Sequence, residues 1–185
     1  AGNWKMNLNR QEAVALAEQV LTQLPVENST EILFAPSFVH LHKIAKMCTE
    51  NTNVFAASQD CSAHESGAFT SEVSANMIAY CNAKYIVLGH SERRANFKES
   101  NQVLKTKVEQ AFANDLAVIF CCGETLEQRE GGVHFDWIKS QLTDKGYVII
   151  KEGISFKDIN KIKKELMVSP FVNSGYGKKP PSFPL

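Results

Sequence analysis

Four short polar segments hold the residue types that could do chemistry, and one of them contains a lysine between two amides. Asn3, Lys5 and Asn7 alternate ahead of the first predicted helix. Alternate residues of an extended segment share one face. One lysine flanked by two amides on that face suits an anionic ligand, although a solvated strand end has the same composition. The four segments are Asn3–Asn7, Ser58–Asp60, Gly89–Arg94 and Cys122–Thr125.

His90 is the second candidate, because it follows an apolar run and precedes a predicted helix start. The positive end of a helix dipole disfavours the imidazolium form, so we expect a neutral ring that donates a hydrogen bond. A histidine with a purely structural role is the alternative. We expect Arg93 and Arg94 to form ion pairs, with Glu92 or Glu124 as their partners.

The motifs of several other site classes are missing from the sequence. Gly89 and Gly123 stand where predicted strands meet loops, but no G-x-G-x-x-G or G-x-x-x-x-G-K-[ST] motif occurs. G-x-S-x-G and H-E-x-x-H are missing too. His40 and His42 are two residues apart in a helix-like stretch, where their side chains would diverge. We therefore expect no familiar nucleotide loop, no metal site and no cofactor.

Apolar runs of strand length alternate with amphipathic helical stretches along the chain. Asn9, with Glu12 three residues on, predicts the start of the first helix, and Pro25 ends it. Asp60–Glu72 is too long for a tight turn and is a candidate binding or interface loop. The predicted strands are Glu31–Pro36, Val54–Gln59, Tyr85–His90, Leu116–Cys122 and Tyr147–Ile150; further helices are predicted around Leu41–Cys48, Ser74–Ala83, Val103–Phe112, Phe135–Leu142 and after Ser155.

These strands are continuous apolar runs separated by helices, which predicts a parallel sheet covered on both sides by helices, an α/β fold. In such folds functional groups gather where strands end. No linker or repeat divides the chain, so we expect one domain over residues 1–185. Its last segment, Ser169–Leu185, is rich in proline and glycine and reads as a loop or tail.

Composition excludes several classes of protein. The chain has 185 residues, 44% of them hydrophobic, with 20 basic and 20 acidic side chains. This balance argues against disorder, a general affinity for nucleic acid and a polybasic membrane anchor. The longest apolar run, Leu116–Cys122, falls short of the ~20 residues that span a bilayer. With five cysteines, no C-x-x-C pair and no visible secretory signal, we expect a cytoplasmic protein with reduced thiols.

Five segments together resemble the triosephosphate isomerase family, in the order in which that family has them. The resemblance covers residues 2 to about 130. It implies a (β/α)₈ barrel that interconverts dihydroxyacetone phosphate and glyceraldehyde 3-phosphate without a cofactor, in glycolysis and gluconeogenesis. The segments are GNWKMN (2–7), AASQD (56–60), SGAFTSEVSA (66–75), VLGHSERR (87–94) and CCGETLEQRE (121–130).

The resemblance also implies roles for individual residues. Asn3 and Lys5 are expected in the active site, with Lys5 holding the anionic substrate. His90 is expected to polarise the substrate carbonyl as a neutral imidazole. Ser91 and Glu92 are its expected supporting neighbours. The loop Cys61–Ala75 is expected to insert into a second subunit of a homodimer, through Gly67, Phe69 and Thr70.

The last third of the chain departs from the family pattern. The segment that carries the family's catalytic base is missing, and Glu152, just after a strand-like run, stands in the analogous place. The family's lid is not recognisable between Gly153 and Phe156. Nor are its late phosphate loops, although the glycines of Asn173–Gly177 could offer backbone donors to an anion.

The number of predicted strands also departs from the family pattern. At most seven strands are predicted, whereas such a barrel has eight and ~250 residues. The alternative to an isomerase is a truncated or divergent barrel that is not catalytic and acts as a binding or structural protein. A different phosphosugar enzyme on the same architecture is the third hypothesis.

Overall fold

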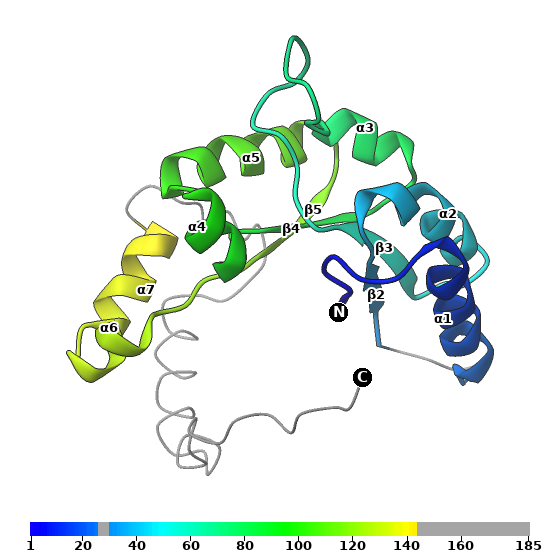
Figure 1. Ribbon diagram of the computed structural model, residues 1–185, viewed down its shortest axis with the longest axis horizontal. Coiled ribbons are helices and arrows are strands. Elements are labelled where there is room, and N and C mark those ends of the chain that lie inside the picture. The colour runs from blue at the N-terminus through cyan, green and yellow to red at the C-terminus, as the bar shows by residue number, and fades with distance from the viewer. Residues whose placement is uncertain (26–29, 144–185) are drawn as a thin grey trace. The chain divides into compact units, whose positions relative to one another are not determined.

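A computed structural model describes residues 1–25 and 30–143 of the chain (Figure 1). The predicted strand Tyr147–Ile150, the candidate base Glu152 and the tail Ser169–Leu185 lie outside the described residues. Predictions about them therefore stay predictions.

Five parallel strands form one sheet in the order β1-β2-β3-β4-β5. Adjacent strands of the sheet are also adjacent in sequence, and each pair is parallel, with registers such as Leu33 opposite Phe55 and Ile86 opposite Val118. The parallel α/β prediction is therefore confirmed for this part of the chain. The strands are β1 (Gly2–Asn3), β2 (Ile32–Ala35), β3 (Val54–Ser58), β4 (Tyr85–Leu88) and β5 (Ala117–Phe120).

Local signals fix the helix starts. Asn9 caps the first helix: its side chain accepts hydrogen bonds from the backbone of Gln11 and Glu12, and the Glu12 carboxylate accepts one from the Asn9 N–H. The predicted capping box is thus confirmed. The helices are α1 (Arg10–Gln23), α2 (Phe38–Cys48), α3 (Ala75–Tyr80), α4 (Ser91–Phe97), α5 (Asn101–Ala113), α6 (Leu126–Glu130) and α7 (His134–Thr143).

Within the described residues the helices pack on one face of the sheet, not on both as predicted. Buried residues of β2 to β4 that point one way pack against α1, α2, α3 and α5. Their neighbours point the other way, and Ala35, Ala57 and Val87 form a cluster made of strand residues alone. The apolar runs are continuous because strand side chains fill the second face themselves, as they do inside a barrel.

The segment that connects β3 to α3 is a long loop, as predicted. A hydrogen bond from the Ser62 N–H to the Val73 carbonyl closes its base at 2.8 Å, and Ser74 caps α3. Residues 64–72 are exposed between these points. In Figure 1 the loop projects beyond α3 and α5. No helix within the described ranges is long and apolar enough to cross a membrane.

Candidate active site

Lys5 lies in a turn directly after β1, and the prediction that it shares an extended face with Asn3 and Asn7 is wrong. Its backbone is left-handed, with φ of 53°. A residue with a Cβ atom adopts this conformation at a cost of about 1–2 kcal/mol. Two side chains hold the turn: Asn3 Oδ1 accepts from the Lys5 N–H at 2.9 Å, and Gln59 Nε2 donates to the Lys5 carbonyl at 2.9 Å.

The side chains of Lys5 and His90 meet at Glu92. Lys5 Nζ lies 2.6 Å from Glu92 Oε1, and His90 Nδ1 lies 3.6 Å from Glu92 Oε2. Lys5 and Glu92 are about half exposed, at 52% and 50% of their side-chain surface. The hydrogen bond from Lys5 holds the pKa of the Glu92 carboxyl below its usual value. The ends of β1 and β4 thus present a cation and an imidazole on either side of one carboxylate.

The hydrogen bond at His90 selects one tautomer of a neutral ring. His90 is the N-cap of α4, and its Nδ1 accepts a hydrogen bond from the Glu92 backbone N–H at 3.2 Å. An accepting Nδ1 carries no proton, so the neutral ring is protonated at Nε2. Within the described residues no group bonds Nε2. A neutral ring in this geometry offers its Nε2–H to an incoming oxygen.

The predicted ion-pair partners of the two arginines are wrong, because Glu92 pairs with Lys5 and Glu124 with Arg129. Arg93 instead lies 2.8 Å from both Asp60 Oδ2 and Glu99 Oε1. Arg94 donates to the Gly89 carbonyl at 2.8 Å and to Asn101 Oδ1 at 2.7 Å. Both arginines therefore tie α4 to neighbouring segments instead of facing the group around Glu92.

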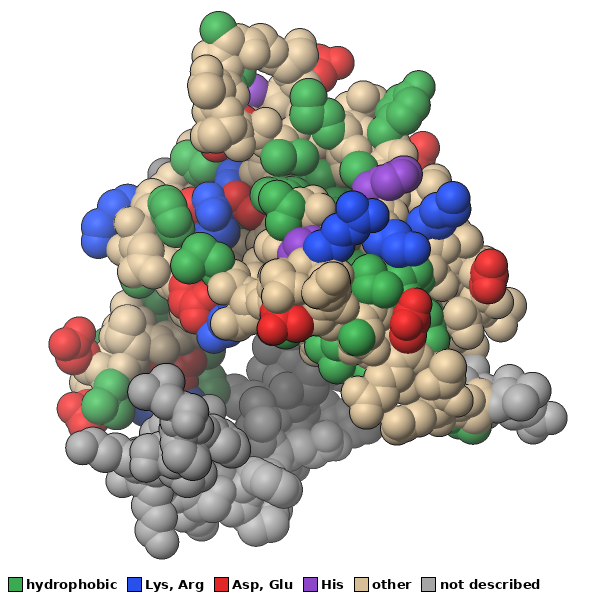
Figure 2. Space-filling view, turned by 45° about the vertical axis from the view of Figure 1, so that its right-hand side comes forward, with side chains coloured by type: hydrophobic (Ala, Val, Ile, Leu, Met, Phe, Trp, Pro, Cys, Tyr) green, Lys and Arg blue, Asp and Glu red, His purple; other side chains and the backbone are tan. Residues whose placement is uncertain are grey.

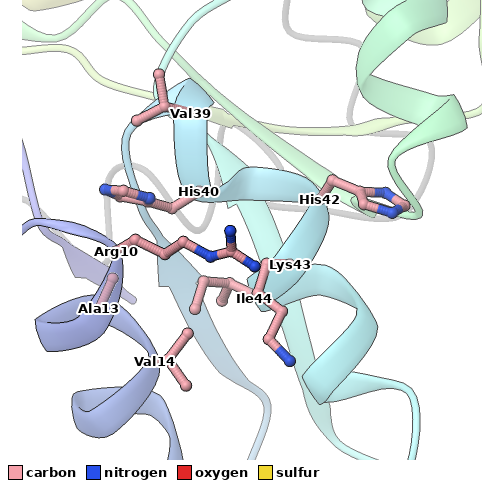
Figure 3. A pocket seen from close by; sticks show the side chains of 8 residues that line it. All are labelled: Arg10, Ala13, Val14, Val39, His40, His42, Lys43 and Ile44. Carbon is pink, nitrogen blue, oxygen red and sulfur yellow. The ribbon is translucent and has the colours of Figure 1, made fainter.

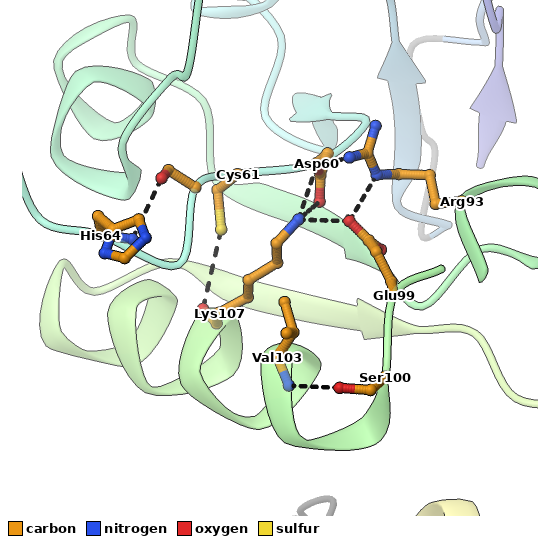
Figure 4. Close-up of polar contacts among 9 residues, drawn as sticks. Asp60, Cys61, His64, Arg93, Glu99, Ser100, Val103 and Lys107 are labelled. Carbon is orange, nitrogen blue, oxygen red and sulfur yellow. Dashed lines mark hydrogen bonds and ion pairs between the residues drawn. The ribbon is translucent and has the colours of Figure 1, made fainter. Parts of the chain in front are cut away.

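Arg93 is one member of a buried charge cluster with Asp60, Glu99 and Lys107 (Figure 4). Lys107 Nζ lies 2.8 Å from Asp60 Oδ1 and 2.5 Å from Glu99 Oε1, and these three side chains are at most 10% exposed. Burial raises the pKa of the Asp60 carboxyl above its usual value, although the neighbouring Lys107 acts in the opposite sense. Burial acts on Glu99 in the same sense, but hydrogen bonds from Lys107 and Arg93 outweigh it and lower the pKa of Glu99.

Gly89 permits the close approach of the ends of β4 and β5. Its φ is +77°, and a Cβ atom there would lie 2.7 Å from the Cys121 carbonyl oxygen and 3.0 Å from Arg94 Nη2. The Cys121 N–H donates to the Leu88 carbonyl at 2.7 Å. A glycine immediately before His90 is therefore a requirement of the backbone.

The remaining predicted residues lie in two places. Ser91 is the exposed first residue of α4. Gly67, Phe69 and Thr70 are exposed in the loop between β3 and α3, where the Phe69 ring stacks on His64 with centroids 3.7 Å apart. Gly67 has a φ of +124°, which favours glycine at this point of the loop.

Two helices also enclose a basic pocket of about 170 Å³ (Figure 3). It lies between α1 and α2, and none of the predicted site residues lines it. In Figure 2 Lys and Arg side chains gather with two histidines on the face over these helices. His40 bonds the Leu8 carbonyl at 3.1 Å while His42 points elsewhere, so the predicted divergence is confirmed. The lining residues are Arg10, Ala13, Val14, Val39, His40, His42, Lys43 and Ile44.

The sequence places Gln59 and Asp60 in one of the four candidate polar segments but assigns neither of them a role. Their signal was present, because both residues follow a predicted strand directly. What the sequence lacked was any indication that Gln59 would bond Lys5 and that Asp60 would bond Arg93. Across residues 1–25 and 30–143 no three His, Cys, Asp or Glu side chains are grouped so as to hold a metal ion.

Parallel strands in sequential order, with helices on one face and polar groups at the strand ends, define a (β/α)-barrel type of fold. Comparison with solved structures agrees. The triosephosphate isomerase of Bartonella henselae superposes with a TM-score of 0.72, covering 95% of this chain and 76% of that one. At 24% sequence identity this likeness shows the fold alone.

The chain belongs to the triosephosphate isomerase family, whose model matches residues 1–154. The triosephosphate isomerase of Porphyromonas gingivalis is 43% identical over 145 residues, which are 78% of this chain and 57% of that protein. That of Clostridium perfringens is 44% identical over 143 residues, again 57% of its length. The chain thus spans somewhat less than two thirds of the curated relatives it matches. Glu152 falls inside the matched range, although outside the described residues.

Proposed function

We propose that this protein interconverts dihydroxyacetone phosphate and D-glyceraldehyde 3-phosphate by proton transfer through an enediolate. One observation carries the proposal: Lys5 and His90, from the ends of β1 and β4, meet around Glu92. An isomerisation of this kind needs a cation for the phosphate ester, a donor where negative charge develops on oxygen, and a base for the carbon acid.

Lys5 supplies the cation in this proposal. Its ion pair with Glu92 is half exposed, and exposed pairs contribute at most about 1 kcal/mol. The pair therefore holds the ammonium in place without binding it too strongly to be shared with an anionic substrate. Asn3, bonded to the Lys5 N–H, keeps the turn that presents this ammonium.

His90 supplies the donor. Its Nε2–H would bond the carbonyl oxygen of the substrate and stabilise the enediolate oxygen that forms when the adjacent carbon loses a proton. We propose Glu152 as the base that removes this proton from one carbon and returns it to the neighbouring carbon, while the hydroxyl proton of the substrate moves from one oxygen to the other. No atom is gained or lost over the cycle, which agrees with a reaction that needs no cofactor.

The assay follows the conversion of glyceraldehyde 3-phosphate with a coupled dehydrogenase that consumes dihydroxyacetone phosphate. We expect turnover above background for the folded chain. Loss of a positioned base generally lowers rates about 10²–10⁴-fold, so the turnover rate of Glu152→Gln should be lower than that of the unchanged chain by about that factor. Glu130→Gln, which changes an exposed glutamate of α6, is the matched control and should keep the rate. Equal rates for the two variants would remove Glu152 from the mechanism, and no turnover by folded protein would remove the reaction.

We also propose a homodimer formed through the loop at residues 61–75, and a cytoplasmic location. Phe69 is 42% exposed in that loop, and Met77 and Tyr80 of the adjoining α3 are 57% and 83% exposed. Three exposed large apolar side chains between residues 69 and 80 support an interface. Sedimentation at micromolar concentration should give a dimer for the unchanged chain and a monomer for Phe69→Asp. A monomeric unchanged chain would contradict the proposal.

A further inference from the structure

The neighbouring residues Gln59 and Asp60 each contact a different half of the candidate site. They follow the last residue of β3, Ser58, and so stand between the ends of β1 and β4 in the sheet. Gln59 Nε2 donates to the Lys5 carbonyl at 2.9 Å and to the Ala35 carbonyl, at the end of β2, at 2.8 Å. The Asp60 carboxylate lies 2.8 Å from Arg93 Nη2.

The contact with Gln59 acts on a strained backbone. A left-handed lysine persists only where its surroundings hold it, because its Cβ atom disfavours that conformation. Two side chains provide this hold, Asn3 at the Lys5 N–H and Gln59 at the Lys5 carbonyl. Gln59 Nε2 donates to the Lys5 carbonyl and also to the Ala35 carbonyl at the end of β2. This amide therefore connects the Lys5 turn to the sheet.

The contact with Asp60 acts on the first turn of α4. The Arg93 and Arg94 N–H groups both donate to the His90 carbonyl, at 3.0 and 3.1 Å, so this turn carries the His90 ring. The Arg93 guanidinium is held on two sides, by Asp60 and by Glu99, and Lys107 holds both carboxylates in turn. The planar guanidinium reaches the two carboxylates through two separate nitrogens, Nη2 for Asp60 and Nε for Glu99.

We propose that Gln59 and Asp60 are positioning residues that set Lys5 and His90 at their working separation, Gln59 through the Lys5 backbone and Asp60 through Arg93. The inference rests on the proposed isomerisation, in which Lys5 binds the phosphate ester and His90 stabilises the enediolate. It assigns two adjacent residues to two different steps. Loss of Gln59 weakens substrate binding, and loss of Asp60 weakens the chemical step.

The kinetic test uses Gln59→Met and Asp60→Asn, which remove one hydrogen-bonding function each and keep nearly the same size. Misplacing a reacting group by about 1 Å can cost about 10²-fold. We expect Gln59→Met to raise KM at least about tenfold with a smaller change in kcat. Asp60→Asn should lower kcat at least about tenfold with a smaller change in KM. The matched controls are Gln102→Met on the exposed side of α5 and Asp115→Asn in an exposed turn, which should change neither constant.

A second readout does not depend on turnover. The ¹⁵N chemical shifts of the imidazole nitrogens report which nitrogen of His90 carries the proton. We expect a single Nε2–H tautomer in the unchanged chain and in Gln59→Met, and a mixture of tautomers in Asp60→Asn. Arg93→Lys, which keeps the charge but has one nitrogen in place of the two that reach Asp60 and Glu99, should give the same mixture and covers the case in which Asp60→Asn does not fold.

Unchanged His90 shifts in folded Asp60→Asn or Arg93→Lys would overturn the role of Asp60. The same pattern of change in kcat and KM in the Gln59 and Asp60 variants would overturn the division of roles between these two residues. If the unchanged chain shows no turnover, the proposed function fails, whereas the ¹⁵N experiment still decides whether Asp60 positions His90.

Discussion

Helix α4 contributes a residue to each of two groups of charged side chains, and the two groups differ in burial. Lys5 and Glu92 form an ion pair with about half of each side chain exposed. Asp60, Glu99 and Lys107 form a cluster that is at most 10% exposed, and Arg93 links it to α4. A water-exposed pair is weak and can be opened by a ligand, whereas removing one partner of a buried pair strands a charge. The comparison separates side chains that bind from side chains that hold the fold.

The strongest test of this separation is Lys107→Met. The change leaves two buried carboxylates without their shared ammonium, and we expect the free energy of unfolding to fall by about 3–5 kcal/mol. Urea denaturation measures it. Lys43→Met, on the exposed side of α2, is the control and should stay within about 0.5 kcal/mol. If both variants lost a similar amount of unfolding free energy, the buried cluster would contribute no more to stability than an exposed lysine does.

The two carboxylates of the cluster should differ in their response to pH. The pKa of Glu99 is lowered in the folded chain, so its ionised form stabilises the fold above its ordinary pKa, and this contribution is lost as the pH falls through the lowered value. The pKa of Asp60 is raised, so its ionised form opposes folding at neutral pH, and the penalty disappears in acid.

Glu99→Gln should therefore destabilise the chain at pH 7 by about 2 kcal/mol, the scale of a hydrogen bond to a charged group, whereas Asp60→Asn removes an ionised group that opposes folding and should not destabilise the chain at this pH. As the pH falls through the lowered pKa of Glu99, the two variants and the unchanged chain should converge. Urea unfolding at several pH values between 3 and 8 measures this. A larger loss for Asp60→Asn at pH 7 would reverse the assignment.

Gly89 marks the boundary between the two groups, because it precedes His90 and its carbonyl binds Arg94. Gly89→Ala places a Cβ atom against the Cys121 carbonyl at a positive φ, and we expect a loss of about 1–3 kcal/mol. Gly123→Ala meets no atom within 4 Å and should be neutral or slightly stabilising. Thermal unfolding of both variants checks the difference, and equal melting temperatures would show that the β4–β5 junction can relax.

The smallest expected change in stability is that of Lys5→Met. Removing an exposed ion pair should cost less than about 1 kcal/mol of unfolding free energy, measured by the same urea titration. A loss as large as that of Lys107→Met would mean that Lys5 serves the fold, and the contrast between the two groups would disappear.

The strands and most helices could be predicted because their signals are local. Apolar runs locate β2 to β5, and Asn9 with Glu12 sets the start of α1. The short helix α6 was missed although Thr125 and Gln128 form a capping box of the same kind. Five residues of helix are too few to show an apolar period, so only the cap could have revealed it.

The site was predictable in composition but not in geometry. Strand ends correctly brought Lys5 and His90 to one edge of the sheet. The left-handed turn at Lys5 was not foreseen, because it depends on Gln59, which lies 54 residues away in the chain. The partners of Arg93 were not foreseen for the same reason. Which charged side chains pair depends on which strand ends become neighbours in the fold. The sequence pattern alone is compatible with several such pairings.

The most direct test of the central claim, that Lys5 and His90 form a proton-transfer site for a triose phosphate, is exchange in D₂O. Proton NMR follows the incorporation of solvent deuterium into dihydroxyacetone phosphate. We expect exchange with the folded chain and a rate about 100-fold slower with Lys5→Met, whose fold is kept. Exchange at the buffer rate by folded protein, or an unchanged rate with Lys5→Met, would contradict it.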